Sequence, residues 1–303
     1  MRHLTRSSVI ALSLTVLAAA CGGGTPDTAD EKPSIVATTS IWGDVVSQIV
    51  REDAAVQVVV PNGADAHEYE ASPRQVADLI EADLVVANGL GLEAGLEDLL
   101  ETARADGANI YEVAPDLDPI GFPAHEDDLD PHVWFDPERM ARAADLIAAR
   151  LAEIDDSIDW QARAAEYSAA LDEVDREMAA RFGAVAPEDR KLVTNHESLG
   201  YLADRYGFEV IAVVIPGGSS LGEPSSAEMA ALVTEIEDEG VDVIFAETTQ
   251  PTHLAEAVAA EVGDDVEVVE LFTESLGGPG SGADTLIGLL STDAGLIGDA
   301  LSS

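Results

Sequence analysis

Short apolar runs alternate with helical patterns along most of the chain. Such runs are rich in β-branched residues, are bounded by turn residues, and cover residues 34–38, 54–60, 83–87, 108–113, 191–194, 210–215, 241–246 and 266–271. Short apolar strands separated by helices are typical of parallel sheets that helices cover on both faces. The pattern therefore predicts an α/β fold built from two parallel-sheet β/α lobes.

The middle of the chain has a different pattern, which predicts helix over residues 137–182 with a break near 155–157. Asp136 followed by Pro137 is a helix start, because Asp caps free N–H groups and Pro suits the first turn. Apolar residues then recur at helical spacing. This stretch predicts a helical bridge and the following division: N-terminal lobe 33–156, linking helix 157–184 and C-terminal lobe 185–303.

The N-terminal residues 1–20 have the pattern of a secretory signal peptide. Arg2 and Arg6 precede an apolar run at 9–20 that ends in small residues. This run is too short to span a bilayer as a helix. We therefore predict that residues 1–20 are removed and that the mature protein is extracytoplasmic.

Cys21 is the only cysteine, so an intrachain disulfide is excluded. A cysteine directly after a signal peptide resembles the acylated first residue of bacterial lipoproteins. The following residues, rich in Gly, Thr, Asp and Pro, are typical of a flexible tether. The resemblance implies lipidation at Cys21, a tether over residues 21–32 and a lipid anchor in the cell membrane.

The charge balance excludes some partners. The 303 residues include 59 Asp and Glu but 15 Lys and Arg, which gives a formal net charge of -44. Nucleic acids and anionic membrane surfaces are excluded as primary partners, because binding them requires Lys and Arg. This acidity favours a cationic ligand, and it also indicates a salt-adapted exterior, because salt screens self-repulsion.

Three histidines and one glutamate follow predicted strands. His67 lies after the second strand, His132 after the fourth, His196 after the run at 191–194, and Glu274 after the last run. Ligands of parallel α/β sheets bind at the carboxyl ends of strands. Three imidazoles and one carboxylate can form a tetrahedral zinc site, which we expect between the two lobes.

Several other residues leave alternatives open. Glu247 follows another predicted strand, and it is either a rival carboxylate ligand or a partner of a histidine ligand. His125 lies in the acidic segment 116–130, which favours a solvated loop over a site of weak cation attraction. His253 begins a helical pattern and is expected at the surface.

Four ordered motifs resemble the zinc- and manganese-uptake solute-binding proteins of ABC importers, and the similarity covers nearly the whole mature chain. The motifs are VPNGADAHEYEASP at 60–73 with ADLVVANGLGLE at 82–93, DPHVWFDP at 130–137, NHESLGY at 195–201 and FTESLG at 272–277.

The resemblance implies the metal ligands His67, His132, His196 and Glu274. It also implies delivery of the metal to an ABC permease with a cytoplasmic ATPase, by a protein expected to be a monomer. Glu274 departs from the family pattern, which commonly has Asp there, so water could replace it as a ligand. His196 favours Zn²⁺, because the family's manganese binders often have Glu at that position and imidazole suits zinc. Mn²⁺ stays an alternative cargo.

Two further functions are weaker alternatives. A zinc hydrolase would need an open coordination position and a general base, and neither His196-Glu197 nor His67-Glu68 begins an HExxH motif. The sequence therefore predicts that the chain is not an enzyme. An adhesin-like surface lipoprotein is also possible, but no segment of the sequence marks a partner surface.

Overall fold

The computed structural model describes residues 32–122, 125–215 and 224–302. Residues Lys32–Ser303 form one compact unit. The predicted signal peptide, the tether up to residue 31 and Cys21 lie outside the described residues.

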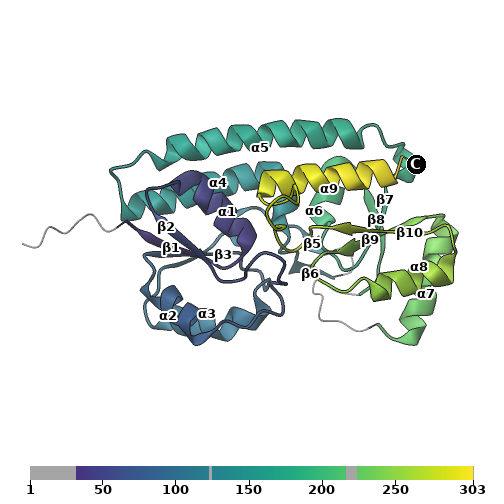
Figure 1. Cartoon of the computed structure of the whole chain (residues 1–303), viewed down its shortest axis with the longest axis horizontal. Coiled ribbons are helices and arrows are strands. Elements are labelled where there is room, and N and C mark those ends of the chain that lie inside the picture. Colours follow the sequence, from purple (N-terminus) through teal and green to yellow (C-terminus); the bar gives the residue numbers. More distant parts are fainter. Residues whose placement is uncertain (1–31, 123–124, 216–223, 303) are drawn as a thin grey trace, which may run out of the picture. The chain divides into compact units, whose positions relative to one another are not determined.

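The first sheet is entirely parallel. Its strands are β1 (Ser34–Ala37), β2 (Ala55–Val58), β3 (Leu84–Ala87) and β4 (Ile110–Glu112), in the order β2-β1-β3-β4. Helix α1 (Ser40–Val50) lies on one side of this sheet, and α2 (Pro73–Glu81) and α3 (Glu97–Ala105) lie on the other (Figure 1). The strands predicted in the first lobe are thereby confirmed.

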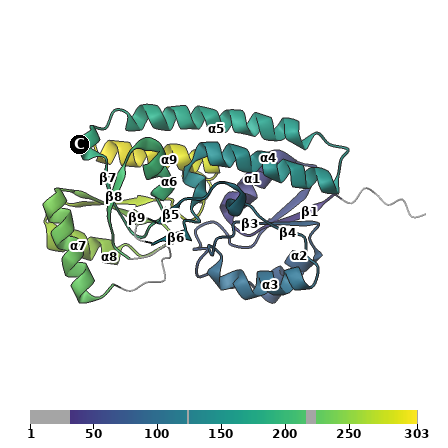
Figure 2. The ribbon, with the colours of Figure 1, turned by 180° about the vertical axis from the view of Figure 1, so that it is seen from behind.

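The second sheet repeats this arrangement. Its strands are β7 (Lys191–Thr194), β8 (Glu209–Val213), β9 (Val243–Glu247) and β10 (Glu267–Leu271), in the parallel order β10-β9-β7-β8. Helices α7 (Ser226–Glu239) and α8 (His253–Val262) lie on one side, and α6 (Gly200–Tyr206) and α9 (Leu286–Ala300) lie on the other (Figure 2). The predicted α/β fold, with two parallel sheets each covered by helices, is thereby confirmed.

A short hairpin precedes the second motif and corrects one prediction. β5 (Gly121–Phe122) pairs antiparallel with β6 (His125–Leu129), within the segment that was expected to be a solvated loop. The sequence hides the hairpin because β5 is only two residues long and β6 begins with a polar, acidic run. Alternation of apolar and polar residues, which marks most strands, is absent there.

The predicted helical stretch forms two helices, α4 (Pro137–Ile154) and α5 (Trp160–Phe182), with the expected break between them. Asp136 begins α4 as predicted, since its Oδ1 accepts the backbone N–H groups of Glu138 at 3.0 Å and Arg139 at 3.3 Å. Among the described residues, no helix is both long enough and apolar enough to cross a bilayer.

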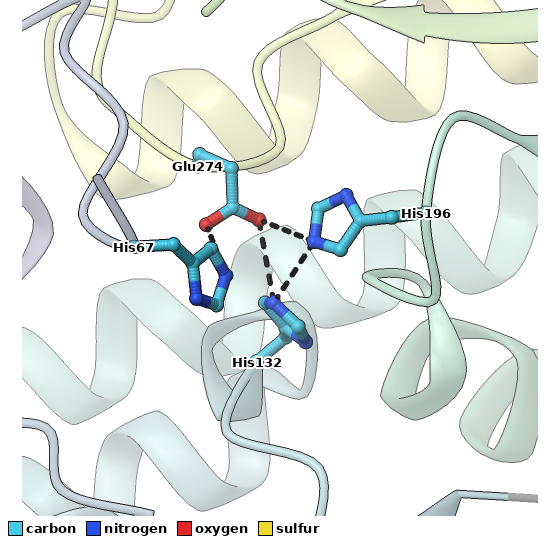
Figure 3. Close-up of side chains that lie close together, drawn as sticks. All are labelled: His67, His132, His196 and Glu274. Carbon is cyan, nitrogen blue, oxygen red and sulfur yellow. Dashed lines mark hydrogen bonds and ion pairs between the residues drawn. The ribbon is translucent and has the colours of Figure 1, made fainter. Parts of the chain in front are cut away.

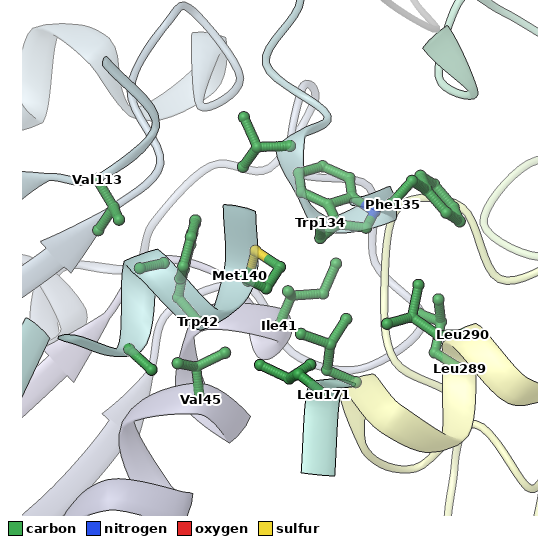
Figure 4. Close-up of a cluster of buried hydrophobic side chains, with 14 of the residues drawn as sticks. Ile41, Trp42, Val45, Val113, Trp134, Phe135, Met140, Leu171, Leu289 and Leu290 are labelled. Atoms are coloured by element: carbon green, nitrogen blue, oxygen red, sulfur yellow. The ribbon is translucent and has the colours of Figure 1, made fainter. Parts of the chain in front are cut away.

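One apolar core runs beneath this helical layer. α5 packs against α4, α1 and α9, so it contacts helices that adjoin both sheets. Trp42 and Val45 from α1, Leu171 from α5, and Leu289 and Leu290 from α9 belong to the same buried cluster (Figure 4). Because a continuous core resists shear, it limits how far the two sheets can move apart.

Candidate metal centre

Side chains from four loops converge between the two sheets. His67 lies in the loop after β2, His196 two residues after β7, and Glu274 three residues after β10 (Figure 3). His132 was expected in the loop after the fourth strand, and the structure places the hairpin of β5 and β6 between that strand and His132. One possible ligand atom from each of the four residues lies within 4.8 Å of those of the other three.

The spacing of these atoms corresponds to a tetrahedral zinc site. Glu274 Oε1 lies 3.4 Å from Nε2 of His132 and 3.4 Å from Nε2 of His196, and the two Nε2 atoms are 3.2 Å apart. Glu274 Oε2 lies 3.6 Å from Nε2 of His67. Zinc bonds of about 2.0–2.1 Å place tetrahedral ligand atoms about 3.3 Å apart. A single small cation therefore suits the space that these atoms surround.

Burial leaves several of these polar atoms without a protein partner. The four residues are between 0% and 3% exposed. His67 Nε2 and both carboxylate oxygens of Glu274 have no hydrogen-bond partner among the described residues. Such buried groups are costly unless something satisfies them. A bound cation would satisfy all three atoms at once.

The electrostatics of the cluster also favour a cation. Burial, together with the charges of His132 and His196, lowers the pKa of His67 to about 3. Burial holds the pKa of His132 well below its usual range and raises the pKa of Glu274. The imidazoles of His67 and His132 are therefore neutral at neutral pH, and the neutral imidazole is the form that binds metals.

His196 differs because it contacts Glu247. Burial lowers the pKa of His196, but the charge and hydrogen bond of Glu247 outweigh that effect and raise the pKa to about 9. Glu247 bonds to Nδ1 of His196, whereas Nε2 faces the cluster. Of the two roles considered for Glu247, this geometry corresponds to a partner of a histidine ligand. Metal binding at Nε2 would displace a proton from His196.

A second carboxylate, Asp130, supports His132. Its Oδ1 lies 2.7 Å from Nδ1 of His132 and accepts the backbone N–H of the same residue at 2.9 Å. Asp65 accepts the backbone N–H of His67 in the same way, at 2.8 Å. Both pairs are Asp-x-His sequences, a turn pattern of Asp that could have been recognised beforehand. Sequence analysis nevertheless missed both aspartates.

Among the histidine side chains that the structure describes, only that of His253 lies outside the cluster. His253 begins α8 and is exposed, which confirms the expectation that it lies at the surface. The side chain of His125 lies outside the described residues.

A buried carboxylate on α9 anchors the start of the Glu274 loop. Asp293 Oδ1 accepts the backbone N–H of Phe272 at 3.1 Å, while its Oδ2 is buried with no partner among the described residues. Burial raises the pKa of Asp293 to about 7. Between pH 4 and 7 the folded state therefore holds a proton that the unfolded state has lost, so stability falls as pH rises.

We expect Asp293→Asn to reduce this loss of stability with pH. At pH 8 the variant should exceed the wild type in free energy of unfolding by up to about 4 kcal/mol, and the difference should vanish near pH 4. Urea unfolding of the metal-free proteins at several pH values measures it. The exposed residue Asp238 on α7 provides the control variant, Asp238→Asn. Equal pH slopes for the wild type and Asp293→Asn would contradict the assignment.

Known proteins resemble the chain over nearly its full length. Residues 35–300 match the model of the ZnuA family, described as Zinc-uptake complex component A periplasmic. The manganese-binding lipoprotein MntA of Halalkalibacterium halodurans is 30% identical over 93% of this chain and 94% of its own length. The manganese ABC transporter substrate-binding lipoprotein PsaA of Streptococcus mitis is 27% identical over 100% of both chains.

A zinc-binding relative is similar in both sequence and structure. The zinc-binding protein TroA of Treponema pallidum is 28% identical over 100% of this chain and 99% of its own length. Its solved structure superposes with a TM-score of 0.82 and covers 89% of this chain and 99% of that one. These matches confirm the resemblance to zinc- and manganese-uptake solute-binding proteins, and the chain belongs to the ZnuA family.

Proposed function

We propose that this protein captures Zn²⁺ as cargo outside the cytoplasm and delivers it to an ABC permease. The observation that carries the proposal is the buried cluster of three imidazoles and one carboxylate, in which Glu274 lies 3.4–3.6 Å from a ring nitrogen of each histidine. We assign His67, His132, His196 and Glu274 as its ligands. Four protein ligands close the coordination sphere of zinc, as a carrier requires, whereas a hydrolase needs an open position for water.

Manganese is the second candidate cargo, and one observation favours it. Both oxygens of Glu274 face the histidines, so the carboxylate can bind through two atoms and raise the coordination number. Mn²⁺ prefers more oxygen ligands than zinc does. Among the relatives, TroA is described as zinc-binding and MntA as manganese-binding. The three imidazoles, including His196, and the higher intrinsic affinity of zinc support Zn²⁺ as the first choice.

The relatives also support the cellular context of the proposal. PsaA is described as an ABC transporter substrate-binding lipoprotein, and TroA as periplasmic. We extend this to a monomer anchored by a lipid on Cys21, with a tether over residues 21–32, working with a permease and its cytoplasmic ATPase. The two β/α lobes, 33–156 and 185–303, then hold the metal between them, and the linking helix 157–184 joins them.

A competitive metal titration tests the proposal. The full-length protein, purified metal-free in detergent, is titrated with Zn²⁺ and Mn²⁺ against a chelating indicator. We expect one tight equivalent of zinc and weaker binding of manganese. A preference for manganese would keep the transport role and change the cargo. Failure to bind either ion tightly would overturn the proposed function.

A further inference from the structure

The turn after β9 contacts both sides of the metal centre without supplying a ligand. Glu247, the last residue of β9, bonds to Nδ1 of His196. Three residues later, Nε2 of Gln250 donates a hydrogen bond to Oδ2 of Asp65 at 2.8 Å. The backbone N–H of Gln250 donates to the carbonyl oxygen of Glu247 at 3.3 Å, which keeps these two side chains on one tight turn.

Asp65 extends this connection to a histidine of the other lobe. Its Oδ1 accepts the backbone N–H of His67, and its Oδ2 accepts the amide of Gln250. Asp65 is 8% exposed and Gln250 is half-buried, so the hydrogen bond from His67 is shielded from water and the one from Gln250 is partly shielded. Hydrogen bonds to a charged acceptor are stronger than neutral ones, above all where water is excluded. One turn thus holds His196 directly and His67 through Asp65.

We infer that Gln250 is a positioning residue that slows the release of bound metal. The inference rests on the proposed function, because it takes His67 and His196 as ligands of the same ion. An ion that holds both histidines also holds Asp65 within reach of Gln250. The two loops must separate before the ion can leave, so the Gln250–Asp65 hydrogen bond has to break. Breaking the bond adds to the barrier for dissociation, whereas the ligand atoms that an incoming ion meets are unchanged, so we expect the bond to act on dissociation more than on association.

The loop that carries His67 makes other contacts across the site, but they reach a different segment. Ser275 Oγ accepts the backbone N–H of Gly63 at 2.8 Å, and Asn62 Nδ2 donates to the carbonyl of Gly277 at 2.9 Å. These contacts join the His67 loop to the Glu274 loop. Loss of Gln250 leaves them in place, so we expect the variant to fold and to bind zinc with faster release.

Rapid-mixing kinetics on the full-length protein test the inference. Zn²⁺ dissociation is measured with excess chelator, and Zn²⁺ association is measured separately. We expect Gln250→Ala to dissociate about tenfold faster, the lower end of the range for partners of metal ligands, with association changed less than about twofold. The matched control is Gln161→Ala on α5, since Gln161 bonds the carbonyl of Asp145 at 3.1 Å far along the chain from the ligands.

A double variant that exchanges the carboxylate and the amide between Asp65 and Gln250 tests whether Gln250 acts through this hydrogen bond or only through folding. Gln250→Glu places a carboxylate against Asp65 and should also release zinc faster. Adding Asp65→Asn restores a donor and an acceptor to the pair, with Asn donating to Glu, so the double variant should return toward the wild-type rate. A residue that matters only for folding would show no such recovery.

The experiment distinguishes failure of this inference about Gln250 from failure of the proposed zinc-binding function. If the wild type binds zinc tightly while Gln250→Ala and Gln250→Glu release it at the wild-type rate, the inference is overturned and the proposed function stands. Equal changes in association and dissociation, or no recovery in the double variant, would also overturn it. If the wild type binds neither zinc nor manganese tightly, the proposed function fails and the inference falls with it.

Discussion

Replacing His196 by alanine is expected to weaken zinc binding by more than about 100-fold. Loss of a partner of a metal ligand costs about 10–100-fold, and loss of the ligand itself should cost more. His196 Nε2 lies within 3.4 Å of both His132 Nε2 and Glu274 Oε1, so its removal would leave one position of the proposed tetrahedral site without a ligand. The variant also leaves the buried carboxylate of Glu247 without its imidazole partner.

The measurement is a competition titration of Zn²⁺ between each protein and a chelator of known affinity. His253→Ala is the matched control, because it removes an exposed histidine from the start of α8. The control should bind zinc as the wild type does. Unchanged zinc affinity in His196→Ala would show that His196 is not a ligand. Glu247, released from its bond to His196, would then become the alternative ligand at this position.

Much of the fold could be predicted because its sheets are parallel and buried. Strands β3 and β9 are buried along their whole length, and their sequences are continuous apolar runs except for Glu247 at the end of β9. The helical stripe of α5 was equally visible, because residues such as Leu171 and Phe182 repeat on one buried face. The hairpin of β5 and β6 was missed because its pairing depends on neighbouring structure more than on local pattern.

The candidate site was predictable to the extent that it follows strand ends. His196 and Glu274 lie two and three residues beyond parallel strands, so topology brings them to the edge between the sheets, and His67 lies in the longer loop after β2. Contacts behind the ligands were not predictable in this way. Asp65 and Gln250 are 185 residues apart, and their hydrogen bond depends on the conformation of two turns. Sequence patterns indicate the periodicity and the ends of helices and strands, but they do not indicate which side chains of two separate loops form a hydrogen bond.

Replacing Glu274 by glutamine is expected to change metal affinity and metal-free stability in opposite directions. Zinc affinity should fall about 100-fold, because the only anionic group among the four proposed ligands loses its charge. Without metal, the charged carboxylate is costly, since burial raises the pKa of Glu274 well above its usual value. An uncharged amide avoids this cost, so the metal-free variant should gain about 1–3 kcal/mol in free energy of unfolding.

Two measurements on the same preparations separate these effects. Urea unfolding of metal-free protein reports the gain in stability, and thermal unfolding with excess Zn²⁺ reports how much stabilisation by zinc is lost. Glu177→Gln, at an exposed position on α5, controls for the general loss of a negative charge. A metal-free variant no more stable than the wild type would contradict the buried-charge argument, and full zinc affinity would mean that water can replace this carboxylate. The expected combination would show that the site is held in a costly arrangement whose instability the cargo ion relieves.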